Sequence, residues 1–316
     1  MPEWLIERGI GETRAVLIEN GEIVEARIQL ERVTAAGSVI EARLTDTGTN
    51  GRIAIAIGED GSEYLLPRGA PGVTEGAKLT IEVTREAIPG GEPWKRPLAR
   101  VAQGSEQQAT DLEGEALPFP APADRMSGWN DLIDEARTGI VRFAGGELRM
   151  STTPAMTLID VDGYLAQGER AVRGAAEAAK AIRRLDIGGS IGIDLPTAGS
   201  KEARQDAAAA IDALLPQPFE RTAVNGFGFV QIVRPRRRAS VLELAQDRAA
   251  FEGRALLRGA AFDASGPKRL VAHPAVISVL GDKPQWIEAL AHQVGGTVEL
   301  RADASIPMSG GYAESL

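Results

Sequence analysis

The spacing of apolar and polar residues divides the chain into a β-rich first part and a mixed α/β second part. Residues 15–18 and 22–28 are rich in strand formers and flank Asn20 and Gly21, a pair that fits a type I′ hairpin turn. Several short β-rich runs follow between residues 34 and 103, separated by turns with Gly, Asp, Asn or Pro. Short strands at this spacing predict a small β-barrel such as an OB fold.

Strand and helix patterns alternate after residue 147. A strand region at 147–162 precedes a helix at 168–185, a strand at 190–195, a helix capped by Ser200 and a third strand at 222–233. This βαβαβ order predicts a sheet with a parallel core. We interpret the preceding polar segment, which ends in the proline-containing run EALPFPAPADR, as a linker or extended connector.

The last quarter of the chain predicts a small α+β subdomain. Ser240 and Glu243 have capping-box spacing and predict a helix that continues to about residue 257. A strand, a short helix, a second helix and a strand follow, and the final residues MSGGYAESL are expected to fray.

Composition bounds the class of protein. The chain has 316 residues, of which 43% are hydrophobic and 25% are charged, which suits roughly two globular domains. No run approaches the ~18 apolar residues of a membrane span. Glu3 and Glu7 lie where a signal peptide would have basic and apolar residues. We therefore expect a cytoplasmic protein with no membrane partner.

Missing residue types restrict the chemistry further. Cysteine is absent, which excludes disulfides, thiol catalysis and zinc sites built on thiolates. The two histidines, His273 and His292, lie in no recognisable motif, and we interpret them as surface or packing residues. Any metal ion must then be bound by oxygen ligands, and such ligands favour Mg²⁺ or Mn²⁺ over zinc.

Three aspartates follow apolar strand residues, where a carboxylate is costly. Asp160 and Asp162 follow the run MTLI, and Asp194 follows the run SIGI. A helical crossover makes the two strands parallel, so Asp160 and Asp194 should share the sheet edge at which ligands bind. Adjacent carboxylates repel each other unless a cation lies between them. We predict that Asp160 and Asp194 bind a divalent metal and that Asp162 orients the site; the alternative is a strand that ends in a solvated Asp-Gly turn.

These segments resemble the ribonuclease E/G family, bacterial endoribonucleases that cut single-stranded RNA. The resemblance is strongest in MTLIDVD (156–162), RRLDIGGSIGIDL (183–195) and FGFVQIVRPRRRASV (227–241), and it extends to the N-terminal hairpin and the C-terminal HPAVISVL segment. It implies an α/β nuclease core, RNase H-like or DNase I-like, with an inserted OB-fold barrel and a small C-terminal α+β subdomain. The expected parts are an N-terminal hairpin of the nuclease core (1–32), an OB-fold RNA-binding-like domain (33–103), a linker or reduced sensor (104–146), a catalytic core (147–240) and a small domain (241–316).

The resemblance assigns roles to the aspartates and arginines. It implies catalytic Mg²⁺ bound by Asp160 and Asp194, and it places Asp162 where the family has an asparagine that orients the site. The net charge of −9 alone argues against nucleic-acid binding, but residues 221–238 hold five arginines and no carboxylate. We interpret these arginines as contacts to the RNA backbone, with a solvated loop as the alternative. They are Arg221, Arg234, Arg236, Arg237 and Arg238.

The chain also departs from the family. Without cysteine it lacks the zinc link that assembles family dimers, and the region of the sensor for 5′-monophosphorylated RNA is reduced. The strands that would stack bases in the barrel offer only Tyr64. We expect a shortened Mg²⁺-dependent endoribonuclease of RNA processing or decay; the alternative is a non-catalytic RNA-binding or regulatory protein on the same fold.

Overall fold

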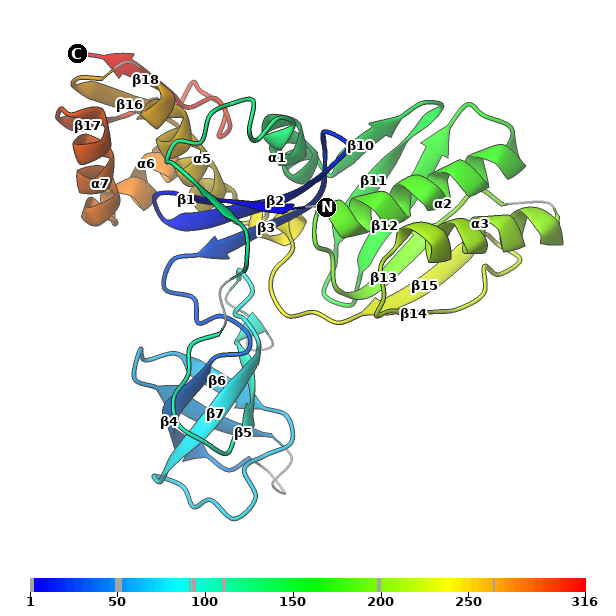
Figure 1. The fold of residues 1–316 in the computed structure, drawn as a ribbon, viewed down its shortest axis with the longest axis horizontal. Helices are drawn as coiled ribbons and strands as arrows, with labels where there is room; N and C mark the ends of the chain where they lie inside the picture. Colours follow the sequence, from blue (N-terminus) through cyan, green and yellow to red (C-terminus); the bar gives the residue numbers. More distant parts are fainter. Residues whose placement is uncertain are drawn as a thin grey trace. The chain divides into compact units, whose positions relative to one another are not determined.

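The computed structural model describes residues 3–48, 53–90, 92, 95–109, 112–197, 200–263 and 265–316 (Figure 1). Contacts divide the chain into two compact units. Unit 1 comprises Met1–Glu31, Glu113–Thr138 and Leu244–Leu316, and unit 2 comprises Arg32–Leu112 and Gly139–Glu243. Among the helices of the described residues, none is both long enough and apolar enough to cross a membrane.

Unit 1 contains a four-stranded sheet with the order β3-β2-β1-β9. Its strands are β1 (Glu3–Arg8), β2 (Glu12–Glu19), β3 (Glu22–Leu30) and β9 (Glu115–Leu117). Asn20 and Gly21 join β2 to β3 with φ angles of 53° and 82°, which confirms the predicted hairpin turn.

The segment predicted as a linker or reduced sensor (104–146) contains several regular elements. β9 pairs in parallel with the edge of β1, and α1 (Trp129–Thr138) follows it. Trp129, Leu132, Ile133 and Ala136 are buried at helical spacing along one face of α1. The interpretation of this segment as a linker or extended connector is therefore wrong for β9 and α1, which are regular elements.

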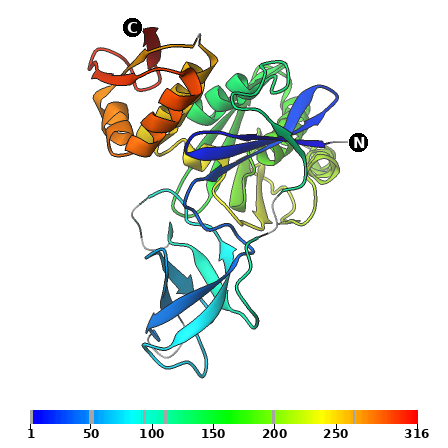
Figure 2. The same ribbon diagram turned by 60° about the vertical axis from the view of Figure 1, so that its left-hand side comes forward.

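The C-terminal part of unit 1 is the predicted α+β arrangement. A three-stranded sheet with the order β17-β16-β18 packs with three helices (Figure 2). The elements are α5 (Arg248–Phe262), β16 (Lys268–Ala272), α6 (Pro274–Gly281), α7 (Pro284–Val294), β17 (Val298–Ala302) and β18 (Tyr312–Ser315). The expected fraying is wrong at β18, because this strand pairs antiparallel with β16.

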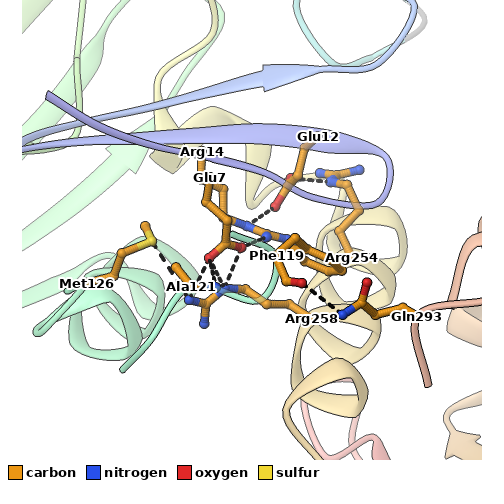
Figure 3. Close-up of polar contacts among 9 residues, drawn as sticks. All are labelled: Glu7, Glu12, Arg14, Phe119, Ala121, Met126, Arg254, Arg258 and Gln293. Atoms are coloured by element: carbon orange, nitrogen blue, oxygen red, sulfur yellow. Dashed lines mark hydrogen bonds and ion pairs between the residues drawn. The ribbon is translucent and has the colours of Figure 1, made fainter. Parts of the chain in front are cut away.

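A cluster of buried ion pairs joins β1, β2 and α5 in unit 1 (Figure 3). Glu7 is fully buried and accepts hydrogen bonds from Arg14 at 2.6 Å and from Arg258 at 3.0 Å. Glu12 accepts hydrogen bonds from Arg14 at 2.7 Å and from Arg254 at 2.6 Å. Burial raises the pKa of Glu12, but the charges of Arg14 and Arg254 outweigh that effect and hold the pKa below its usual value.

Unit 2 holds a closed five-stranded barrel and a six-stranded sheet. The barrel strands are β4 (Val39–Asp46), β5 (Ala54–Gly58), β6 (Glu63–Leu66), β7 (Lys78–Arg85) and β8 (Leu98–Val101). Alternate residues, including Leu44, Leu66 and Ile81, fill its interior. The predicted small barrel is therefore present.

The six-stranded sheet of unit 2 has the order β10-β11-β12-β13-β15-β14. Its strands are β10 (Ile140–Phe143), β11 (Gly146–Thr152), β12 (Thr157–Gly163), β13 (Gly189–Asp194), β14 (Glu220–Arg221) and β15 (Phe229–Arg234). β12 and β13 are parallel as predicted, but β15 runs antiparallel to β13. The helix after β13 leads first to β14, whose short hairpin with β15 reverses the chain, so a parallel third strand is the wrong expectation.

Two helices pack side by side along this sheet (Figure 1). They are α2 (Gln167–Arg184) and α3 (Lys201–Leu214), and Ser200 caps α3 as predicted by accepting a hydrogen bond from the amide of Ala203. At Gly174 the helix lies so close to β12 that a Cβ atom would come within 2.2 Å of Val161. The capping box of Ser240 and Glu243 is also present, but its helix, α4 (Val241–Leu244), ends after one turn.

The buried cluster of unit 1 leads to a prediction about stability. Glu12→Gln leaves the buried Arg254 without its counter-charge and leaves Arg14 paired with Glu7 alone, and it should lower the free energy of unfolding at pH 7 by about 3 kcal/mol or more. Because the pKa of Glu12 is depressed in the folded state, its contribution is present above the ordinary glutamate pKa of 4.5 and is lost as the pH falls through the lower folded value. Urea unfolding followed by tryptophan fluorescence should show the two proteins converging below pH 4.5.

Glu299→Gln is the matched control for this prediction. Glu299 pairs with Arg269 on the surface, with 55% of its side chain exposed, so its loss should cost less than about 1 kcal/mol. An effect of Glu12→Gln no larger than that of the control would contradict a structural role for the cluster.

Candidate functional site

The structure places Asp160 and Asp194 side by side. They are Cα partners in the parallel register of β12 and β13, and they form the last pair of that ladder. β13 ends at Asp194, whereas β12 continues to Gly163 by pairing with β11. The shared edge is therefore as predicted, but Asp160 lies within its strand and not at its end.

Strand alternation turns these carboxylates away from the helices. Ile159 and Val161 are 1% and 4% exposed, and Val161 lies against α2. Asp160 and Asp162 occupy the opposite face of β12 and are exposed. The buried Ile159 and Val161 pack β12 on its helix side, whereas Asp160 and Asp162 face solvent.

The electrostatic environment of Asp160 is unfavourable for its charge. Partial burial raises the pKa of Asp160, and the negative charges of Asp162 and Asp194 raise it further. The amide of Val161 and the charge of Arg149 act in the opposite direction without cancelling the shift. A bound cation at this position would relieve the repulsion among the three acids.

Arg149 is a neighbour that the sequence analysis missed. It is the Cα partner of Asp160 on β11, and its Nε lies 3.7 Å from a carboxylate oxygen of Asp162. It also pairs with Glu147 at 2.5 Å. The sequence analysis treats residues 147–162 as one strand region, whereas β11 and β12 form an antiparallel pair, and only the register of that pair determines which β11 residue faces Asp160.

Asp160 and Asp194 are the two carboxylates that would hold a hard divalent ion at this place. Mg²⁺ is commonly bound by one or two carboxylates, with water and substrate phosphate as the other ligands. Across the described residues, no group of three or more His, Cys, Asp or Glu side chains is arranged to hold a metal. An ion at this place would have Asp160 and Asp194 as its two protein ligands, with Asp162 two residues beyond Asp160 on the same face.

Most of the arginines in the basic run are bound to carboxylates of unit 2. Arg234 and Arg238 lie 3.8 and 3.2 Å from the carboxylate of Asp186, and Arg236 pairs with Glu243. These ion pairs attach the segment after β15 to the end of α2 and to the capping box. Their side chains thus have a structural role, whatever else they contact.

The other two arginines differ from each other. Arg221 donates two hydrogen bonds to Asp212 at the end of α3, one of them 2.7 Å long. Arg237 is exposed, and no ion pair joins it to any part of the chain that the structure describes. Among the five arginines, Arg237 is therefore the cation most available to a ligand.

Tyr64, the aromatic residue considered for base stacking, belongs to the barrel core. It is 1% exposed, and its hydroxyl group donates to Thr34 at 2.9 Å. Burial raises its pKa. Its ring cannot stack on a base without opening the barrel.

A separate cavity of about 920 Å³ lies in unit 1 between α1, α5 and the C-terminal strand. Its charged lining includes Arg14, Arg258, Arg137 and Glu252, and Glu252 receives two hydrogen bonds from Arg137 at 2.6 and 2.7 Å. These groups neutralise one another, in contrast to Asp160 and Asp194, whose charges repel. The aspartate pair is accordingly the stronger candidate site.

Comparison of the sequence with protein-family models and with curated protein sequences finds no match.

Removing the negative charge of Asp160, or binding a cation beside it, should change the melting temperature Tm of the protein. Without divalent ions, Asp160→Asn should raise Tm slightly, because it removes a carboxylate whose charge is disfavoured in the folded state. Addition of millimolar Mg²⁺ should raise Tm of the wild type and leave Asp160→Asn unchanged. Differential scanning calorimetry measures both effects.

Asp206→Asn provides the control, since Asp206 is an exposed aspartate on α3. It should keep the full response to Mg²⁺. An equal response in wild type and Asp160→Asn would place the ion elsewhere.

Proposed function

We propose that the protein is a Mg²⁺-dependent endoribonuclease that cuts single-stranded RNA, in a shortened form similar to the ribonuclease E/G family. The observation that supports this function most strongly is the register that sets Asp160 beside Asp194 on the open face of an α/β sheet. The proposal includes the finer assignments of the nuclease core and of the five-stranded barrel as an OB fold.

Each aspartate has a distinct role in the proposed reaction. Asp160 and Asp194 bind the ion, and Asp162 accepts a hydrogen bond from a water molecule that it orients toward the phosphate. When bound, Mg²⁺ polarises the scissile phosphate and lowers the pKa of the attacking water. Arg149 limits the negative charge that an incoming phosphate would meet, because it lies beside Asp160 and Asp162.

RNA affinity is proposed to depend on backbone contacts, with Arg237 as the exposed contact. The described part of the barrel buries Tyr64, and residues 33–103 carry nine acids and eight bases, so the barrel offers no electrostatic compensation. The proposed substrate is therefore a flexible single strand that crosses the sheet face beside the aspartates.

The proposal is tested by incubating the protein with a single-stranded, AU-rich RNA labelled at its 5′ end. Wild type should cleave it internally in Mg²⁺ or Mn²⁺ and not in EDTA. Asp160→Asn and Asp194→Asn should each lower the rate by at least about 100-fold, because each removes a ligand of the ion. Both variants should bind the RNA at least as well as wild type, since a charge that repels phosphate is gone.

Asp206→Asn should cleave like wild type and thereby exclude a general effect of charge. Metal-dependent RNA binding without cleavage would favour the alternative, a non-catalytic RNA-binding or regulatory protein on the same fold. Cleavage that persists in Asp160→Asn would exclude the aspartate pair as the active site.

Arg237→Ala should weaken RNA binding alike for every sequence. Loss of one phosphate contact should flatten the dependence of log affinity on log salt concentration by about 0.7. Titration by fluorescence anisotropy at several salt concentrations measures this slope. The control is Arg269→Ala, which removes a surface arginine of unit 1 that pairs with Glu299; equal slopes in both variants would exclude Arg237 from the RNA path.

A further inference from the structure

A small apolar surface adjoins the aspartate pair on the open face of the six-stranded sheet. It consists of Leu158 on β12, Gly192 on β13 and Phe229 on β15, and we refer to it as the Phe229 shelf. A Cβ atom on Gly192 would lie 2.6 Å from Cζ of Phe229 and 3.0 Å from Cδ2 of Leu158. The ring and the leucine side chain thus lie across Gly192, where no side chain stands between them.

The shelf is in register with the carboxylates. Asp160, Asp194 and Phe229 are successive Cα partners across β12, β13 and β15. The ring of Phe229 lies over Gly192, two residues before Asp194 on β13, and two residues of a strand span about 6.6 Å. A ribose bridges a comparable distance between a phosphate and its base.

The shelf is not explained by the packing of the sheet. The helix side of β15 is occupied by Val230 and Ile232, both fully buried, whereas Phe229 lies on the opposite face and is half-buried. Leu158 is 38% exposed. An apolar face that is partly open to water beside paired acids suits a ligand that is flat and apolar at one end and anionic at the other.

We propose that the Phe229 shelf binds the nucleobase of the nucleotide whose phosphate lies at Asp160 and Asp194. This inference rests on the proposed function. Stacking on the ring of Phe229 fixes the base, and the register of the three strands then positions the phosphate at the aspartates. The contact is tolerant of sequence, because every base has a flat face, and purines gain more from it than pyrimidines because they are larger.

The test compares intact RNA with RNA that lacks the base at one position near the cleavage point. Binding is measured by anisotropy in EDTA, where cleavage is prevented, for wild type, Phe229→Leu and Phe229→Tyr. Wild type should bind the RNA with the abasic position about 5- to 100-fold more weakly than intact RNA. Phe229→Leu should bind intact RNA as weakly as wild type binds the abasic RNA, and its affinity should not fall further with the abasic RNA. Phe229→Tyr should bind both RNAs like wild type.

Phe227→Leu is the matched control, because Phe227 is 83% exposed and lies two residues before Phe229 outside the strand. It should bind both RNAs like wild type. If Phe229→Leu weakens binding equally for intact and abasic RNA, the ring acts only through the fold and the shelf is excluded. If Phe229→Leu binds intact RNA like wild type, the shelf is excluded as well.

The same experiment separates this inference from the proposed function. Wild type that cleaves in Mg²⁺ while Phe229→Leu shows no loss contradicts the shelf alone. Wild type that binds with the predicted coupling between Phe229 and the base, yet never cleaves, contradicts the nuclease and retains the shelf. Absence of any RNA binding by wild type contradicts both.

Discussion

The parallel register of β12 and β13 is the constraint on which the proposed site depends. Side chains alternate between the two faces of a strand, so a slip of one residue would move Asp160 to the helix side and bring Val161 out to solvent. The same register places Phe229 and Arg149 beside the aspartates, on β15 and β11. The proposed site is therefore built from residues of four neighbouring strands, β11, β12, β13 and β15.

Packing on the other face maintains this register against the repulsion of the acids. Ile159, Val161, Ile191 and Ile193 are buried beneath the helices, and burial of such side chains contributes about 1.5–3 kcal/mol each. Gly174 lets α2 approach Val161 more closely than any other residue would allow. Repulsion between two exposed charges about 4 Å apart costs about 1 kcal/mol in water, which is less than the burial of these four side chains contributes.

The sequence predicts the parts of this site that depend on local pattern. Helical periodicity identifies α2 and α3, and the crossover between two apolar strands places Asp160 and Asp194 at one edge. Local pattern does not determine the direction of β15, because the two-residue strand β14 is too short to recognise. Nor does it show that Arg234 and Arg238 bind Asp186, since that residue is distant in the chain and only the folded sheet brings them together.

The aromatic residues show the same division. Tyr64 follows the alternation of a barrel strand, but which of the two faces points inward is decided by closure of the barrel. Phe229 lies beside Asp194 because β15 is antiparallel to β13. The expected parallel strand would not have predicted this pairing. Residues whose role depends on long-range pairing are therefore the ones that the sequence leaves undetermined.

The central claim, that Asp160 and Asp194 together bind one divalent ion, is tested most directly by replacing Mg²⁺ with Fe²⁺. Ascorbate and peroxide then generate hydroxyl radicals at the bound iron, and these cut the backbone within a short distance of it. If the two aspartates share one ion, cuts should fall near both Asp160 and Asp194, be suppressed by excess Mg²⁺ and be absent in Asp194→Asn. Cuts that cluster at any other position, or that persist unchanged in Asp194→Asn, would contradict it.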